Sequence, residues 1–97
     1  MQGKKFTKDG IPDLLCCING QFFGIEVKAS NGRPKPLQLY NLRKIHDAGG
    51  FGVLIYPNMW DEFKEFLKNP TQSDDWYMKN KKFQDDWNER LKKEGDV

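Results

Sequence analysis

Two carboxylates and an amine in this chain have the types and spacing of a site that holds a divalent cation. Asp13 ends the string Gly-Ile-Pro-Asp, and Glu26 and Lys28 flank a single valine. Mg²⁺ and Mn²⁺ commonly take one or two protein carboxylates and fill their other positions with water and substrate phosphate. A lysine beside such a cation can orient or help deprotonate an attacking water. The pattern indicates metal-dependent phosphodiester hydrolysis, and a solvated charged face without chemistry is the alternative.

A β-hairpin is the element expected to bring these groups together. Two apolar runs flank Asn19-Gly20, the dipeptide most typical of a two-residue type I′ turn. With that turn, Asp13 lies directly opposite Glu26, and Lys28 shares the face of Glu26 because side chains alternate along a strand. Two like charges opposite each other repel, and a bound cation would offset this repulsion. The other face is the predicted core, with Leu14, Cys16, Ile18, Phe23, Ile25 and Val27.

A loop, a helix and a third strand are expected to follow the hairpin. Turn-forming residues fill 29–35, helical spacing of apolar residues runs over 36–48 with Gly49 as a C-cap, and 51–56 is a continuous apolar run. A strand, a helix and a strand predict a right-handed crossover, so the last strand should lie parallel to its predecessor in a mixed sheet. Gln38, in the first helical turn, can hydrogen-bond to a phosphate or to a metal-bound water.

The C-terminal part predicts two more helices. A short helix begins at Asn58 or Asp61, and a longer one follows Ser73 as its N-cap. We expect the longer helix to fold back across the sheet, and contact with a partner chain in a dimer is the alternative. Acidic neighbours disfavour base stacking by its tryptophans. Its amphipathic stripe holds Trp76, Asn80, Phe83, Trp87 and Leu91.

The motifs together resemble a known nuclease family. The Gly-x-Pro-Asp string, the strand over 25–28, the downstream Gln38 and the helix that ends in Ala-Gly-Gly before a strand occur in this order over about residues 9–57. This order is similar to that of the PD-(D/E)xK superfamily, and within it to the virus-type replication-repair nuclease (VRR-NUC) domains. The resemblance implies an α/β, restriction-endonuclease-like fold: a mixed β-sheet flanked by helices, with a nuclease core over 1–69 and a C-terminal amphipathic helix over 70–97.

The resemblance also implies roles for individual residues. Asp13 and Glu26 would hold Mg²⁺ or Mn²⁺, with the carbonyl of Val27 as a further ligand, while Lys28 would assist the water and Gln38 the phosphate. Standalone members of the family look like homodimeric resolvases of four-way (Holliday) junctions, so the implied substrate is branched DNA. The expected protein is a metal-dependent endodeoxyribonuclease.

One departure from the family keeps other interpretations open. Family members usually begin with a helix carrying another acidic residue and then a strand, whereas twelve residues precede Asp13 here and Asp9 is the only acid among them. The chain therefore looks like a short form. A DNA-binding or assembly module with the same fold and impaired catalysis is one alternative, and a metal-free dimerisation module is another.

Charge is distributed unevenly along the chain. Residues 1–50 hold eight Lys and Arg against four Asp and Glu, whereas residues 51–97 hold eight against ten. The motifs lie in the basic half, and neutralising phosphates supplies most sequence-independent DNA binding. Lys8, Arg33 and Lys35 are the predicted backbone contacts. Because no apolar run approaches the roughly 20 residues that span a bilayer and no signal peptide is visible, we expect a cytoplasmic protein of a phage or bacterial cell without a membrane partner.

Overall fold

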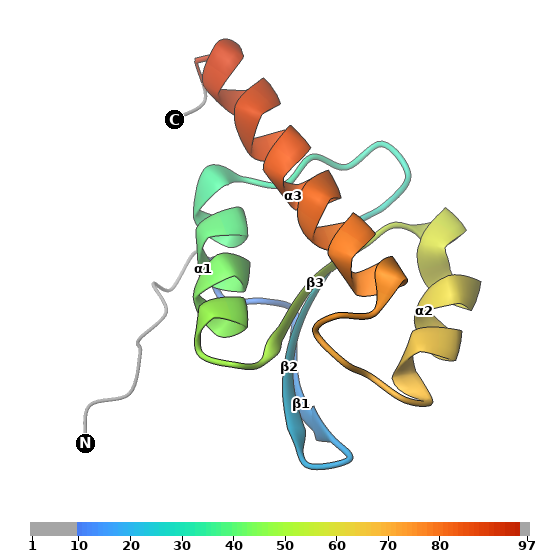
Figure 1. Ribbon diagram of the computed structural model, residues 1–97. Coiled ribbons are helices and arrows are strands. Elements are labelled where there is room, and N and C mark those ends of the chain that lie inside the picture. The colour runs from blue at the N-terminus through green and yellow to red at the C-terminus, as the bar shows by residue number, and fades with distance from the viewer. Residues whose placement is uncertain (1–9, 96–97) are drawn as a thin grey trace.

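The computed structural model describes residues 10–95, which form three strands and three helices (Figure 1). The order along the chain is β1, β2, α1, β3, a 3₁₀ turn, α2 and α3. Their bounds are Leu14–Ile18, Gln21–Val27, Pro36–Asp47, Phe51–Ile55, Pro57–Met59, Trp60–Leu67 and Asp75–Lys93.

The sheet has the predicted connections and register. β1 and β2 pair antiparallel around Asn19 and Gly20, whose φ angles of 50° and 78° suit a type I′ turn. β3 lies parallel to β2, so the strand order is β1-β2-β3. The mixed sheet and the crossover through α1 are therefore confirmed. Leu14 pairs with Ile25, and the next positions outward are those of Asp13 and Glu26.

Helices cover both faces of this sheet, which is seen nearly edge-on between α1 and α2 in Figure 1. One face packs against α2 and the start of α3 in an aromatic core. The predicted core face is correct at its centre and wrong at one end: Leu14 is 53% exposed and Val27 is 49% exposed, and both lie at the end of the hairpin away from the turn. The residues of this core are Phe23, Ile25, Phe51, Val53, Ile55, Phe63, Phe66 and Tyr77.

The other face lies unusually close to α1. A Cβ atom at Gly24 would lie 2.2 Å from Cδ1 of Ile45, and one at Gly52 would lie 2.1 Å from the backbone oxygen of Leu42. Glycine at these positions removes the side chains that would hold the helix away. As a result, the first turn of α1 lies against β2, at the strand end that carries Glu26.

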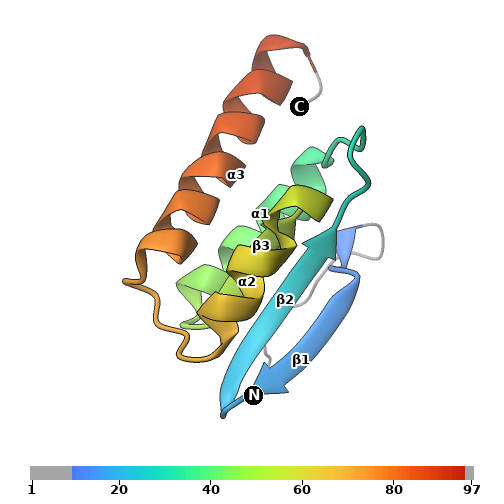
Figure 2. The ribbon, with the colours of Figure 1, turned by 90° about the vertical axis from the view of Figure 1, so that its right-hand side faces the viewer.

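α3 runs along the β3 edge of the sheet, on the opposite side from β1 (Figure 2). The Asn80 amide accepts a hydrogen bond from the Leu54 N–H and donates one to the Leu54 carbonyl, at 3.0 and 2.9 Å. Gln84 donates to the Gly52 carbonyl, and the Gly52 N–H donates to the Tyr77 hydroxyl. Side chains of α3 therefore occupy the backbone groups that another strand would use, which protects this edge from further pairing.

The long helix folds back on its own sheet, as expected, and the predicted N-cap was wrong. Asp74 is the N-cap instead of Ser73, and its carboxylate accepts a hydrogen bond from the Trp76 amide at 2.8 Å. Of the predicted stripe, Asn80 and Leu91 are buried, and Trp76, Phe83 and Trp87 are half-buried and pack against the core. The buried Tyr77 and Gln84 were not predicted. No helix among residues 10–95 is long and apolar enough to cross a membrane.

Candidate active site

Asp13 is tied to the end of β2. Its Oδ2 atom accepts a hydrogen bond from the Val27 backbone N–H at 2.9 Å, while the side chain stays exposed to solvent. This bond uses one of the two carboxylate oxygens. Val27 itself lies between Glu26 and Lys28 at the C-terminal end of β2, so all four residues gather at one corner of the sheet.

Glu26 is a buried carboxylate with one satisfied oxygen and one unsatisfied oxygen. Only 2% of the residue is exposed. Oε2 accepts a hydrogen bond from Nε2 of Gln38 at 2.8 Å and lies 3.3 Å from Nζ of Lys28. Oε1 is buried and has no hydrogen-bond partner among the residues that the structure describes. A buried carboxylate oxygen without a donor is costly, which is typical of a functional site.

The electrostatic environment raises the pKa of Glu26 above its usual value. Burial is the largest cause, because it penalises the charged form, and the nearby Asp13 charge adds to it. The Lys28 ammonium acts in the opposite direction and only partly compensates. The negative charge of Asp13 makes the charged form of Glu26 less favourable. A cation shared by the two carboxylates would relieve this repulsion.

Gln38 connects this carboxylate to the N-terminus of α1. Its Oε1 accepts a hydrogen bond from the Lys35 backbone N–H at 2.9 Å, which fixes the orientation of the amide and directs Nε2 to Glu26. Lys35 is the N-cap of the helix, and Gln38 is the third helical residue, so the bond is half of a capping box. Both ends of the Gln38 amide thus position other groups of this site.

Asn41 is a positioning residue that sequence reasoning missed. Its side chain is buried and donates a hydrogen bond to the Gly10 carbonyl at 2.8 Å. A Cβ atom at Gly10 would come within 2.5 Å of this amide and 2.7 Å of Leu37. Asn41 therefore holds the turn before Asp13 against α1. The only sequence signal was a polar residue on the apolar side of the predicted helix.

These residues fit a hard divalent cation. The donor set contains the buried Oε1 of Glu26 and a second carboxylate, that of Asp13, which is held in place by a backbone amide. No group of three or more His, Cys, Asp or Glu side chains gathers anywhere in residues 10–95. Two carboxylates nevertheless suffice for Mg²⁺, which keeps several waters and uses substrate phosphate as a ligand.

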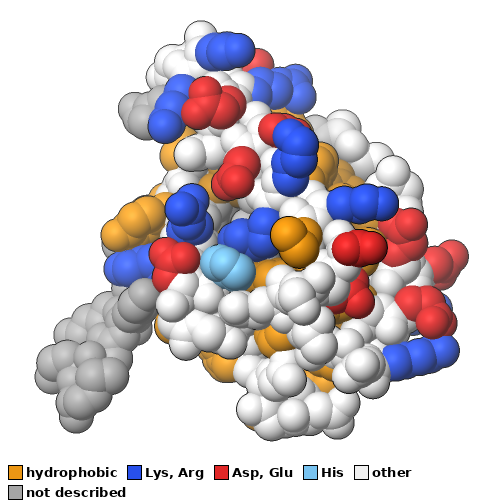
Figure 3. Space-filling view, in the orientation of Figure 1, with side chains coloured by type: hydrophobic (Ala, Val, Ile, Leu, Met, Phe, Trp, Pro, Cys, Tyr) orange, Lys and Arg blue, Asp and Glu red, His pale blue; other side chains and the backbone are white. Residues whose placement is uncertain are grey.

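The predicted DNA contacts have different surroundings. Arg33 forms an ion pair with Glu94, the C-cap of α3, and its guanidinium carbon lies 5.4 Å from the Trp87 ring centroid. Lys35 is exposed at the start of α1. Lys8 lies outside the described residues. Figure 3 shows Lys and Arg side chains interspersed with Asp and Glu over α1 and α3, so this face of the molecule is of mixed sign.

His46 lies in the last turn of α1, at the opposite end of the helix from Gln38. Its Nδ1 is 2.9 Å from the Tyr77 hydroxyl, which also accepts the Gly52 N–H at 3.2 Å. Burial lowers the pKa of His46, and the charge of Lys81 lowers it further. His46 therefore supports the packing of α3.

Comparison of the chain with protein-family models, with curated proteins and with solved structures found no match.

Proposed function

We propose that this protein is a metal-dependent DNA endonuclease of the restriction-endonuclease-like fold. The observation that carries the proposal is the arrangement at Glu26: a buried carboxylate with one unsatisfied oxygen, next to Asp13 and in contact with Lys28. The motif resemblance of the sequence adds to it. If Glu26 served only in a structural ion pair, its contact with Lys28 would be sufficient. The nearby Asp13 carboxylate and the unsatisfied Oε1 of Glu26 add an energetic cost to folding without adding stability.

The chain's own groups can divide the work of phosphodiester hydrolysis. Asp13 and Glu26 would hold Mg²⁺ or Mn²⁺, with the Val27 carbonyl as a further ligand implied by the resemblance. The cation, when bound, would polarise the phosphate and increase the acidity of its water. Lys28, 3.3 Å from Glu26, is available to orient the attacking water or to neutralise charge on the phosphoryl oxygens. Gln38 keeps Glu26 in place through its hydrogen bond.

A cleavage assay tests this proposal. Labelled four-way junction, flap, single-stranded and duplex DNA are incubated with the protein in Mg²⁺ or Mn²⁺ and, separately, in EDTA. We expect cleavage that requires the metal and that falls by at least about a hundredfold in Asp13→Ala and Lys28→Ala. Asp61→Ala is the matched control, because Asp61 is an exposed carboxylate on α2 far along the chain from these motifs. Preferential cleavage of the junction, together with a dimer in solution, would support the homodimeric resolvase.

One observation favours a second candidate, a DNA-binding or assembly module with impaired catalysis. Oε2 of Glu26 and Oδ2 of Asp13 are already satisfied by internal donors, so most of the cluster is stable without a ligand. The same assay separates the two candidates. Salt-sensitive binding of DNA without cleavage in either metal would favour the module and contradict the nuclease.

A further inference from the structure

The loop over 29–35 leaves β2 at Lys28 and turns back toward it. The Gly32 N–H donates a hydrogen bond to the Ala29 carbonyl at 2.8 Å, which closes a tight turn. A Cβ atom at Gly32 would lie 3.4 Å from Cβ of Lys28, so the turn packs against the lysine of the carboxylate site. Arg33 follows Gly32 directly and is therefore attached to the part of the loop that lies beside Lys28.

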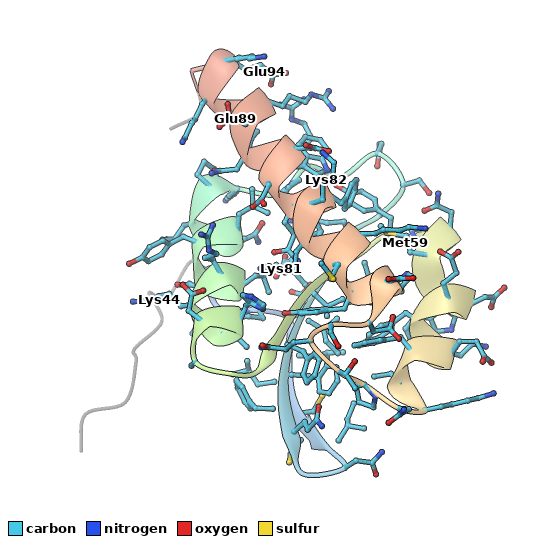
Figure 4. The ribbon with its side chains drawn as sticks, in the orientation of Figure 1. Lys44, Met59, Lys81, Lys82, Glu89 and Glu94 are labelled. Carbon is cyan, nitrogen blue, oxygen red and sulfur yellow. The ribbon has the colours of Figure 1, made fainter. Side chains whose placement is uncertain are left out.

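A carboxylate 61 positions further along the chain holds Arg33. The guanidinium pairs with Glu94, which Figure 4 shows at the C-terminal end of α3. Arg90, one helical turn before Glu94, donates from Nε to the same carboxylate at 3.2 Å and so keeps it in place. The neighbouring acid on this helix, Asp86, pairs with Lys82 at 3.4 Å. Glu94 is thus the carboxylate of α3 that is positioned on the loop arginine.

This ion pair is a contact that a phosphate can replace. Carboxylates and phosphates bind a guanidinium through the same charge-assisted hydrogen bonds. The side chains of Arg33 and Glu94 are 42% and 41% exposed, so a ligand can reach both, and ion pairs at such exposure contribute little to stability. The turn keeps a separate anchor, because the Tyr56 hydroxyl donates to the Gly32 carbonyl at 2.8 Å. Loss of the Glu94 contact would therefore leave the loop beside Lys28.

We infer that Glu94 is an internal competitor of the DNA backbone: it occupies Arg33 in the free protein, and a phosphate of the substrate displaces it on binding. The inference rests on the proposed nuclease function, because the displacing phosphate belongs to the DNA that reaches Lys28. The exchange replaces one ion pair by another and breaks no covalent bond. DNA binding is therefore weaker than the basic residues of the loop alone would give, and Glu94 sets this restraint.

Removal of the Glu94 charge tests the inference. Binding of labelled duplex and four-way-junction DNA is measured in EDTA, so that no cleavage intervenes. Glu94→Gln should tighten binding by about three- to tenfold at low salt, and the gain should shrink as the salt concentration rises. Glu89→Gln is the matched control, because Glu89 is an exposed acid near the same end of α3 (Figure 4). It removes the same charge without releasing Arg33 and should change the affinity by less than about twofold.

A double-mutant cycle assigns the gain in affinity to Arg33. In the Arg33→Gln background, Glu94→Gln should no longer tighten binding, because no guanidinium remains at this position to be released. An unchanged or weaker affinity of Glu94→Gln would overturn the inference. An equal gain in Glu89→Gln, a gain that survives without Arg33, or the absence of DNA binding would overturn it as well.

The cleavage assay separates this inference from the proposed function. In that assay, Glu94→Gln should lower KM and leave kcat unchanged, because Glu94 competes for DNA and takes no part in the chemical step. The expected binding pattern without metal-dependent cleavage would contradict the nuclease alone. Metal-dependent cleavage with the same KM in Glu94→Gln and in the unaltered protein would contradict the role of Glu94 alone.

Discussion

Gln38 and Glu26 are joined by a hydrogen bond of 2.8 Å between Nε2 and Oε2, and this bond connects the first turn of α1 to the end of β2. The same glutamine accepts the Lys35 N–H at the helix N-terminus. Helix capping and carboxylate positioning therefore depend on one side chain. The close approach of α1, permitted by Gly24 and Gly52, brings the two residues within reach.

Glu26→Gln should increase stability. The raised pKa means that the folded state disfavours the charged carboxylate, so the stability linked to Glu26 is present below the unfolded-state value of 4.5 and is lost as pH rises through the raised value. At pH 7 we expect the variant to gain about 1 kcal/mol in free energy of unfolding, with a gap that narrows on acidification. Urea unfolding at pH 7 and pH 4 measures this. A loss of stability at pH 7 would identify Glu26 as a structural anchor.

Gln38→Ala and Gln38→Glu should separate capping from carboxylate positioning. The alanine variant removes both hydrogen bonds of Gln38, and we expect a loss of about 1–3 kcal/mol. The glutamate variant keeps an acceptor for the Lys35 N–H and places a second negative charge at Glu26, which should raise the Glu26 pKa further. Its stability should exceed that of the alanine variant at acidic pH, where the repulsion from Glu26 is relieved by protonation, and this advantage should shrink toward pH 7. Its metal-dependent activity should require a higher pH. Equal stability of the two variants at acidic pH would contradict the capping role.

Asn80→Leu should be among the most destabilising substitutions in α3. The leucine leaves the N–H and carbonyl of Leu54 without their side-chain partners in a buried environment. We expect a loss of about 2–4 kcal/mol in thermal or urea unfolding, because each unsatisfied buried backbone group costs about 1–3 kcal/mol. Asn88→Leu, on the same helix and only half-buried, is the control and should change stability by less than about 0.5 kcal/mol. Similar losses in both variants would argue against edge protection.

His46 should make the fold sensitive to mild acid. Its pKa is lowered in the folded state, so the unfolded chain binds more protons as pH falls through 6.5, and stability decreases toward the lowered value. The groups around the ring are Lys81 and Arg43, which lower the pKa, and Asp47 and Asp85, which raise it. Unfolding between pH 7.5 and pH 5.5 should show this loss, and His46→Phe should reduce it. An unchanged slope in the variant would contradict the assignment.

Short sequence motifs predicted the hairpin and the two ends of α1, because these features depend on the conformational preferences of neighbouring residues. Asn19-Gly20 fixed the hairpin register, and proline at the start and Gly49 at the end bounded α1 closely. Within α1, Leu39 is buried and the neighbouring Tyr40 is exposed. The proximity of Glu26 and Lys28 followed from strand alternation alone.

Long-range pairing accounts for what the sequence did not reveal. Arg33 and Glu94 are 61 positions apart, and nothing local indicates that they pair. Asn80 and Gln84 recognise backbone groups of β3, which carry no sequence signature. Val27 alternates correctly with Ile25 and is nevertheless exposed, because burial depends on which part of the sheet the helices cover. The role of Gln38 as a bridge to Glu26 also required the tertiary structure.

Titration with Mn²⁺, followed by NMR line broadening of the backbone amides, tests most directly whether Asp13 and Glu26 form a cation site. We predict broadening that is strongest at the amides of residues 13 and 26–28 and that is lost in Glu26→Gln, while Asp61→Asn leaves it unchanged. Broadening that survives in Glu26→Gln, or that centres on another acidic segment such as Asp74 and Asp75, would contradict the account.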